Sequence, residues 1–192
     1  EVKTSKKVRD MFDELGIPYT TEHALTGVKG RMKGRDSKYT VAMIGELDAI
    51  VCHRHPKADP MTGAAHCCGH NVQIANLFAV AMGLQAEGVM EALGGDVVLF
   101  AVPAEEMIEV DYRNTLREKG TIKYLGGKQQ LIYEGAFDDI HMAMQMHVET
   151  AKTPAGEMGL GSTSNGFVSK LIEYHGKVAH AAQAPHEGIN AL

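Results

Sequence analysis

The chain has 192 residues, of which 44% are hydrophobic and 22% charged, a composition typical of a globular protein with enough apolar material for a core. Its net charge of −5, without a basic cluster, argues against nucleic acid as the main partner. No apolar run approaches the roughly 20 residues of a membrane span, so we expect no membrane partner.

The three cysteines argue against a disulfide framework. Their number is odd, and Cys67 and Cys68 are adjacent, a spacing at which a disulfide is strained. The charged start of the chain, Glu1 to Val8, lacks the apolar segment of a secretory signal. We therefore expect free thiols and a cytoplasmic location.

The predicted elements alternate between helices and strands. A first helix capped by Thr4 or Ser5 is followed by an outer strand or hairpin, a buried strand, a long apolar helix and a second buried strand. A short exposed helix, a third buried strand and a half-exposed strand come next. In chain order their ranges are 4–15, 28–32, 39–44, 72–87, 97–102, 112–119, 141–147 and 167–174. This order predicts an α/β layered domain.

The cysteine and histidine of His66-Cys-Cys-Gly-His70 are the first candidate site residues. Cys68 and His70 are two positions apart, so on a helix they would point to opposite sides, but in a loop they can converge on one ion. Thiolate and imidazole both suit zinc or a neighbouring transition metal. Buried or incidental residues remain an equally good explanation of this motif alone.

Further polar residues follow buried strands. Glu105 and Glu106 come directly after one strand, where one carboxylate could bind a metal and its neighbour could face a metal-bound water as a general base. On these two residues alone, a solvated acidic pair in a loop is the better explanation. His147 ends another strand, and Asp48 follows a third, as a turn residue or a carboxylate that orients a ligand. Because active sites of α/β sheets gather at strand ends, the order of these residues is more informative than any one of them.

Taken together, the motifs resemble the M20 metallopeptidases, and most closely the amidohydrolases that act on N-acyl amino acids, aminobenzoyl-glutamate, hippurate and auxin conjugates. The resemblance runs from about Val41 to Leu192. It rests on Gly-Glu-Leu-Asp-Ala, His-Cys-Cys-Gly-His-Asn, Pro-Ala-Glu-Glu, Met-His147 and the stretch from Gly176 to His186.

The resemblance implies a three-layer zinc-peptidase-like catalytic domain with a central mixed sheet, over residues 1–162, and the start of a smaller α+β lid and dimerisation domain, over 163–192. It implies a homodimer and two divalent metal ions per subunit, with zinc or manganese first and cobalt or nickel as alternatives. The metal ligands would be Cys68, His70, Glu106 and His147. Glu105 would be the general base, His180 would polarise the substrate carbonyl across a dimer, and Asp48 would support the metals.

Several features depart from the family pattern. Asn71 stands where this branch commonly has Asp, and Cys67 replaces a small residue. The segment from Met107 to Leu125 is longer than expected and could affect substrate choice or subunit contact. The family has a last histidine ligand far towards the C-terminus, so we expect the sequence to be part of a longer protein.

The main hypothesis is hydrolysis of the amide bond of an N-acyl amino acid or related conjugate. A catalytically silent metal- or ligand-binding homologue and a dipeptidase of the same family are the alternatives. A cysteine hydrolase with Cys68 as nucleophile and His70 as base is disfavoured, because residues two apart on one short loop rarely meet in the required geometry.

Overall fold

The computed structural model describes residues 1–148, 159, 161, 166–168, 170 and 172–192. The chain divides into two compact units, Glu1–Thr150 and Ala151–Leu192. The predicted boundary at residue 162 lies outside the described residues, so the assignment of the two domains stays a prediction.

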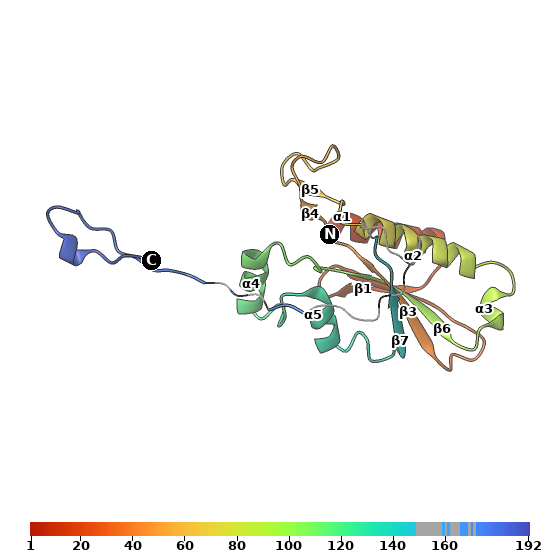
Figure 1. The fold of residues 1–192 in the computed structure, drawn as a ribbon. Coiled ribbons are helices and arrows are strands. Elements are labelled where there is room, and N and C mark those ends of the chain that lie inside the picture. The colour runs from red at the N-terminus through yellow and green to blue at the C-terminus, as the bar shows by residue number, and fades with distance from the viewer. Residues whose placement is uncertain (149–158, 160, 162–165, 169, 171) are drawn as a thin grey trace. The chain divides into compact units, whose positions relative to one another are not determined.

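The first unit is built on a five-stranded mixed sheet with the order β1-β2-β6-β3-β7 (Figure 1). Strands β6, β3 and β7 run parallel to one another, and the β1-β2 hairpin is joined to β6 by an antiparallel pairing of β2. The strands are β1 (Tyr19–His23), β2 (Gly27–Met32), β3 (Thr40–Glu46), β6 (Asp96–Val102) and β7 (Met142–Gln145). This confirms the predicted central mixed sheet.

Helices cover both faces of this sheet. On one face, α1 (Val2–Glu14) and α2 (His70–Leu84) pack against a core that includes Phe12, Leu77 and Leu99. On the other face, α5 (Gly127–Tyr133) contributes Leu131 to a second core that includes Phe100. Consecutive residues of β6 enter opposite cores because side chains alternate along a strand, which explains the continuous apolar run predicted at 97–102. The first unit is therefore three-layered, as expected.

The remaining elements are short. A two-stranded hairpin, β4 (Ile50–Val51) and β5 (Ala64–Ala65), lies between β3 and α2. Helix α3 (Val89–Ala92) precedes β6, and α4 (Val110–Glu118) matches the exposed helix predicted at 112–119. In the second unit the described residues include one 3₁₀ turn, η1 (Pro185–Glu187), and a single bridge between Lys177 and Ile189.

Three predictions about the elements were wrong. The strand predicted as buried at 141–147 is β7, whose residues are all exposed and which pairs only with β3 among the described strands. The first helix is capped by Glu1 rather than Thr4 or Ser5, and the Ser5 hydroxyl instead donates to the Thr26 carbonyl oxygen at 2.7 Å. The described residues of 167–174 form no strand, and residues 169 and 171 lie outside the described part.

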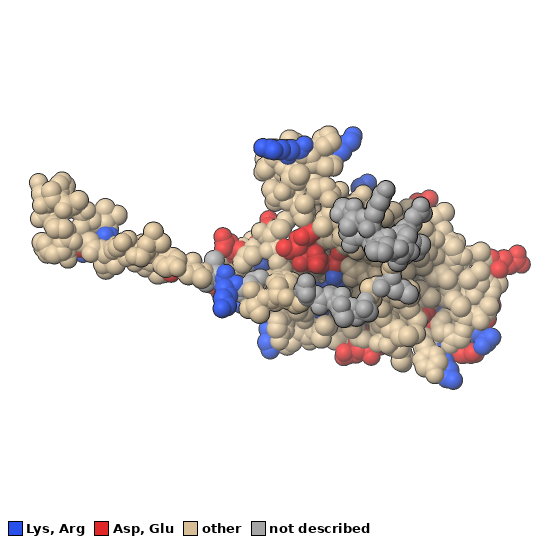
Figure 2. All heavy atoms as spheres, viewed as in Figure 1, with Lys and Arg blue, Asp and Glu red and all other residues tan. Residues whose placement is uncertain are grey.

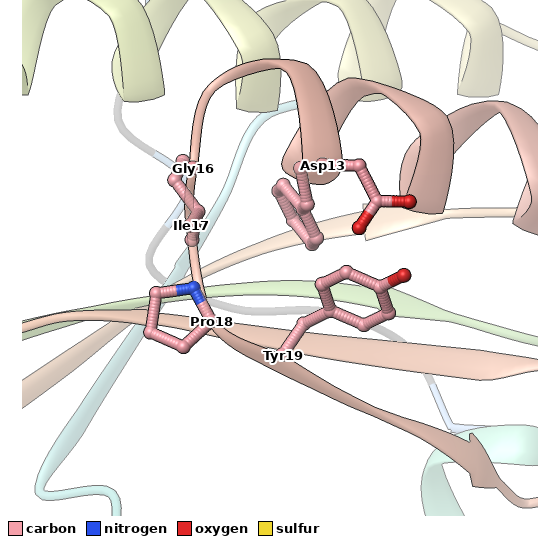
Figure 3. Close-up of a pocket in the computed structure, with 6 residues that line it drawn as sticks. Asp13, Gly16, Ile17, Pro18 and Tyr19 are labelled. Carbon is pink, nitrogen blue, oxygen red and sulfur yellow. The ribbon is translucent and has the colours of Figure 1, made fainter.

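The hollow at the end of α1 has none of the chemistry expected of the predicted metal site. No helix in the described ranges is long and apolar enough to cross a membrane. A hollow of about 360 Å³ lies beside the end of α1, where the Tyr19 ring faces Asp13 (Figure 3). A hydrogen bond with Asp13 raises the pKa of Tyr19. None of the described residues that line this hollow is a cysteine or histidine, so its chemistry is unlike that of a transition-metal site.

Candidate metal centre

Three parallel strands deliver the candidate residues to one edge of the sheet. Asp48 follows β3, Glu105 and Glu106 follow β6, and His147 follows β7. Since β6, β3 and β7 are neighbours and parallel, their carboxyl ends lie together. Acidic side chains gather near the middle of the first unit in Figure 2. The predicted convergence at strand ends is thus observed.

The loop before α2 brings Cys68 and His70 to the same place. Gly69 has a φ of +104°, a conformation that side chains other than glycine rarely adopt, and a Cβ there would lie 2.4 Å from Val148 Cγ2. This bend lets ligands two positions apart face one point. Cys68 Sγ lies 3.9 Å from His147 Nε2, and ligand atoms of Cys68, His70 and His147 all lie within 4.8 Å of one another.

His70 occupies the centre of the cluster and is 1% exposed. Its Nδ1 donates to the main-chain carbonyl oxygen of Asp48 at 3.0 Å, which directs Nε2 into the site. Around Nε2, a carboxylate oxygen of Glu46 lies at 2.9 Å and oxygens of Glu105 and Glu106 lie at 3.8 Å. Burial alone would lower the pKa of His70, but Asp48 and Glu46 outweigh it and raise the pKa to about 10.

Asp48 joins two of the candidate ligands. Its Oδ1 lies 3.1 Å from His70 Nδ1, and its Oδ2 accepts a hydrogen bond from the Glu106 main-chain N–H at 2.8 Å. Although burial raises the pKa of Asp48, these contacts outweigh it and lower the pKa below its ordinary value. The geometry fits the predicted supporting role, in which an outer carboxylate orients ligands.

The two glutamates differ in their surroundings. Glu105 is 40% exposed, whereas Glu106 is 20% exposed and its buried Oε1 has no hydrogen-bond partner among the described residues. Burial, and then repulsion by Glu46, raises the pKa of Glu105, which moves it towards the range of a general base. This asymmetry fits the predicted roles of Glu106 as a ligand and Glu105 as a base. Among the described residues, however, the potential ligand atoms that lie within 4.8 Å of one another include Glu105, with Glu46 and His70, and neither such group contains Glu106.

A divalent cation fits this set of donors. Within the part of the chain that the structure describes, His70 Nε2 and Glu106 Oε1 are both buried without an aligned hydrogen-bond partner, and these two potential ligand atoms lie 3.8 Å apart. A hydrogen bond with Glu106, together with burial, raises the pKa of Cys68 to about 11. A cation would relieve this accumulation of negative charge and favour the thiolate, the form that binds metal.

Sequence reasoning missed the group that Glu46 forms with Lys128 and Gln73 next to His70. Glu46, the last residue of β3, is 1% exposed and pairs with Lys128 of α5. Gln73 donates to Glu46 Oε2 at 3.0 Å and accepts from the Glu46 main-chain N–H at 2.8 Å. A glutamate at the end of an apolar strand was the available signal for this site, whereas the contribution of Lys128 depends on the packing of α5.

Asn71 and His180 are the remaining residues that the family resemblance singles out. Asn71 is exposed in the first turn of α2, and its side chain makes no hydrogen bond with the cluster within the described ranges. His180 belongs to the second unit, where its Nδ1 accepts from the main-chain N–H groups of Ala182 and Gln183 at 3.2 and 3.1 Å. Their predicted roles stay predictions.

Comparison of the chain with known proteins supports the family resemblance found in the sequence. No protein-family model matches the chain. An IAA-amino acid hydrolase ILR1-like 4 of Arabidopsis thaliana is 29% identical and matches 97% of this chain and 39% of its own length. One of the subunits of the p-aminobenzoyl-glutamate hydrolase of Escherichia coli is 28% identical over 81% of this chain and 29% of its own length. The chain thus spans less than half of these relatives.

A solved structure agrees with the sequence relatives. The YXEP protein of Bacillus subtilis, a dinuclear metal-binding peptidase of the M20 family, matches with a TM-score of 0.61 and 25% identity. The match covers 78% of this chain and 38% of that protein. These relatives and the candidate ligands beside three parallel strands agree with one another, and the chain belongs to the amidohydrolase branch of the M20 metallopeptidase family.

Proposed function

We propose that the protein is a metal-dependent amidohydrolase that cleaves the amide bond of an N-acyl amino acid or a related conjugate. The observation that carries the proposal is the convergence of Cys68, His70 and His147 within 4.8 Å, with Glu105 and Glu106 beside His70. The named activities of the relatives, which act on amino-acid and glutamate conjugates, support this class of substrate.

The residues of the cluster divide the chemistry between them. Cys68, His70, Glu106 and His147 would hold divalent metal, which when bound supplies a Lewis acid for the scissile carbonyl and lowers the pKa of water. Glu105 takes a proton from the attacking water and later passes it to the leaving amine. Asp48 holds His70 and Glu106 in place.

Further properties of the protein follow from the resemblance. We propose two metal ions per subunit, zinc or manganese first, because the YXEP protein is described as dinuclear and sulfur and nitrogen ligands suit zinc. His180 would polarise the substrate carbonyl in a homodimer formed through the second unit. Its Nδ1 is engaged by the main chain, so Nε2 would be the ring atom that reaches substrate. The three cysteines, all free, suit a cytoplasmic location.

Metal content and hydrolysis test this proposal together. The full-length protein should contain close to two metal ions per chain and hydrolyse members of a panel of N-acyl amino acids. Chelation should abolish turnover, and one added ion should restore it. Absence of both metal and turnover would instead favour a silent binding homologue.

Substitution of the general base tests the mechanism. Glu105→Gln should abolish turnover and leave the metal content unchanged, because Glu105 removes a proton rather than binding metal. Glu109→Gln is a matched control, since Glu109 lies four residues further along the same segment as the cap of α4. Activity that survives in Glu105→Gln would refute the assigned role.

A further inference from the structure

Glu46 is buried beside the candidate ligands, although it is not one of the ligands that the family resemblance implies. Its side chain is among the most buried of the first unit, and it belongs to β3 rather than to a ligand loop. Ligand atoms of Glu46, His70 and Glu105 all lie within 4.8 Å of one another. A buried carboxylate needs partners that offset the cost of removing its charge from water.

The partners of Glu46 hold one of its oxygens on the site side. Lys128 pairs with Oε1 from α5, and the amide of Gln73 donates to Oε2 from α2. Gln73 also binds the Glu46 main-chain N–H, so a single side chain fixes both the backbone and the carboxylate. The position of Lys128 depends on Gly127, where a Cβ would lie 1.7 Å from the Pro103 carbonyl oxygen. Oε2 is therefore held facing His70.

The contact between Glu46 and His70 has the dimensions of two ligands on one ion. Oε2 lies 2.9 Å from Nε2, yet Nε2 has no aligned hydrogen-bond partner among the residues that the structure describes. Two ligands that each lie about 2.1 Å from an ion are about 3.0 Å apart at the right angles of an octahedral site and about 3.4 Å apart in a tetrahedral site, so the observed spacing is nearer to the octahedral geometry. The other ring nitrogen, Nδ1, is engaged by Asp48, so any ion on His70 is bound by Nε2, next to Glu46.

We propose that Glu46 is a further metal-binding group of this centre, which binds the same ion as His70 and is held in place by Lys128. The inference rests on the proposed function only in requiring that the site binds metal, and it does not depend on hydrolysis. The charge of the ion would be balanced by Glu46 in addition to Cys68 and Glu106.

Metal titration of Glu46→Gln tests the inference. Calorimetry with Co²⁺ should show an affinity for one of the two ions that is about 10–100-fold lower than in wild type, since glutamine keeps the shape but loses the anionic donor. The visible absorption of bound Co²⁺, which depends on the number and geometry of its ligands, should change as well. Glu134→Gln is a matched control, because Glu134 also accepts hydrogen bonds, from Ala24 and Gln130, away from the candidate ligands.

A second substitution keeps the test decisive if Glu46→Gln is poorly folded. Glu46→Asp preserves the charge but withdraws the carboxylate by one methylene, so it should also weaken Co²⁺ binding and change the absorption. Wild-type affinity and absorption in either folded variant would overturn the inference. Weaker binding in the variants of a protein that hydrolyses nothing would support the inference and refute the proposed activity. If wild type binds no metal, both are refuted.

Discussion

Asp48→Asn provides the sharpest test of how the cluster is organised. One carboxylate contacts two candidate ligands, with Oδ1 at 3.1 Å from His70 Nδ1 and Oδ2 at 2.8 Å from the Glu106 main-chain nitrogen. The substitution keeps the shape of the side chain but removes its charge. One of the two contacts must then change in kind, because an amide has one donor and one acceptor end.

The size of the effect follows from these two contacts. If the amide oxygen of the new asparagine still accepts from Glu106, its NH₂ group faces the Nδ1–H of His70, and two donors meet at about 3 Å. The Nδ1–H of His70 already donates to the Asp48 main-chain carbonyl oxygen, so Oδ1 acts on the ring through its charge at 3.1 Å. The substitution removes this attraction, and the contact between donors adds to the loss. We expect a loss of about 1.4–2.7 kcal/mol, which corresponds to the 10–100-fold drop in metal affinity typical of outer-shell changes.

Competition with a chromogenic chelator measures this affinity. Asp59→Asn is the control, because Asp59 accepts from the main-chain N–H groups of Met61 and Thr62, both at 3.0 Å, in the β4–β5 loop. Thermal unfolding of the metal-free variants separates loss of affinity from loss of fold. Metal affinity of Asp48→Asn within twofold of wild type would refute the assigned role of Asp48.

Three further substitutions test the packing of the fold and the loop that carries Cys68 and His70. Hydrogen bonds from Ser37 and Arg31 outweigh burial and lower the pKa of Asp96, so its stabilisation is present above the unfolded pKa and is lost as pH falls through the folded pKa. Asp96→Asn should therefore lower the free energy of unfolding at neutral pH by about 2–3 kcal/mol, and denaturant titrations should show this difference shrinking in acid. Gly69→Ala should weaken metal binding more than Gly88→Ala, since both glycines have positive φ but only Gly69 is blocked by a neighbouring side chain; equal metal affinities would contradict this. Leu99→Ala should cost about 2–5 kcal/mol in the same titrations, because Leu99 is fully buried, and a loss below about 1 kcal/mol would count against this packing.

Local patterns predicted most of the elements that carry the site. The apolar run before Asp48 and the run before Glu105 each predicted a buried strand, and both strands are observed as β3 and β6. The edge position of β7 was not predictable in this way. Its methionines have the pattern of a buried strand, but burial depends on what packs on the faces of the sheet, and the residues of β7 are all exposed at the edge of the described sheet.

The sequence by itself determined the identity of the candidate ligands and their order along the chain, because each follows a recognisable strand or precedes a recognisable helix. Only the tertiary structure decided that Glu46 and Lys128 belong to the same centre. They are separated by 82 positions, and their pairing depends on the packing of α5 beside the loop after β6, which no local pattern encodes. Short-range periodicity specifies which face of an element is apolar, whereas the pairing of a buried carboxylate with a partly exposed lysine depends on how whole elements pack.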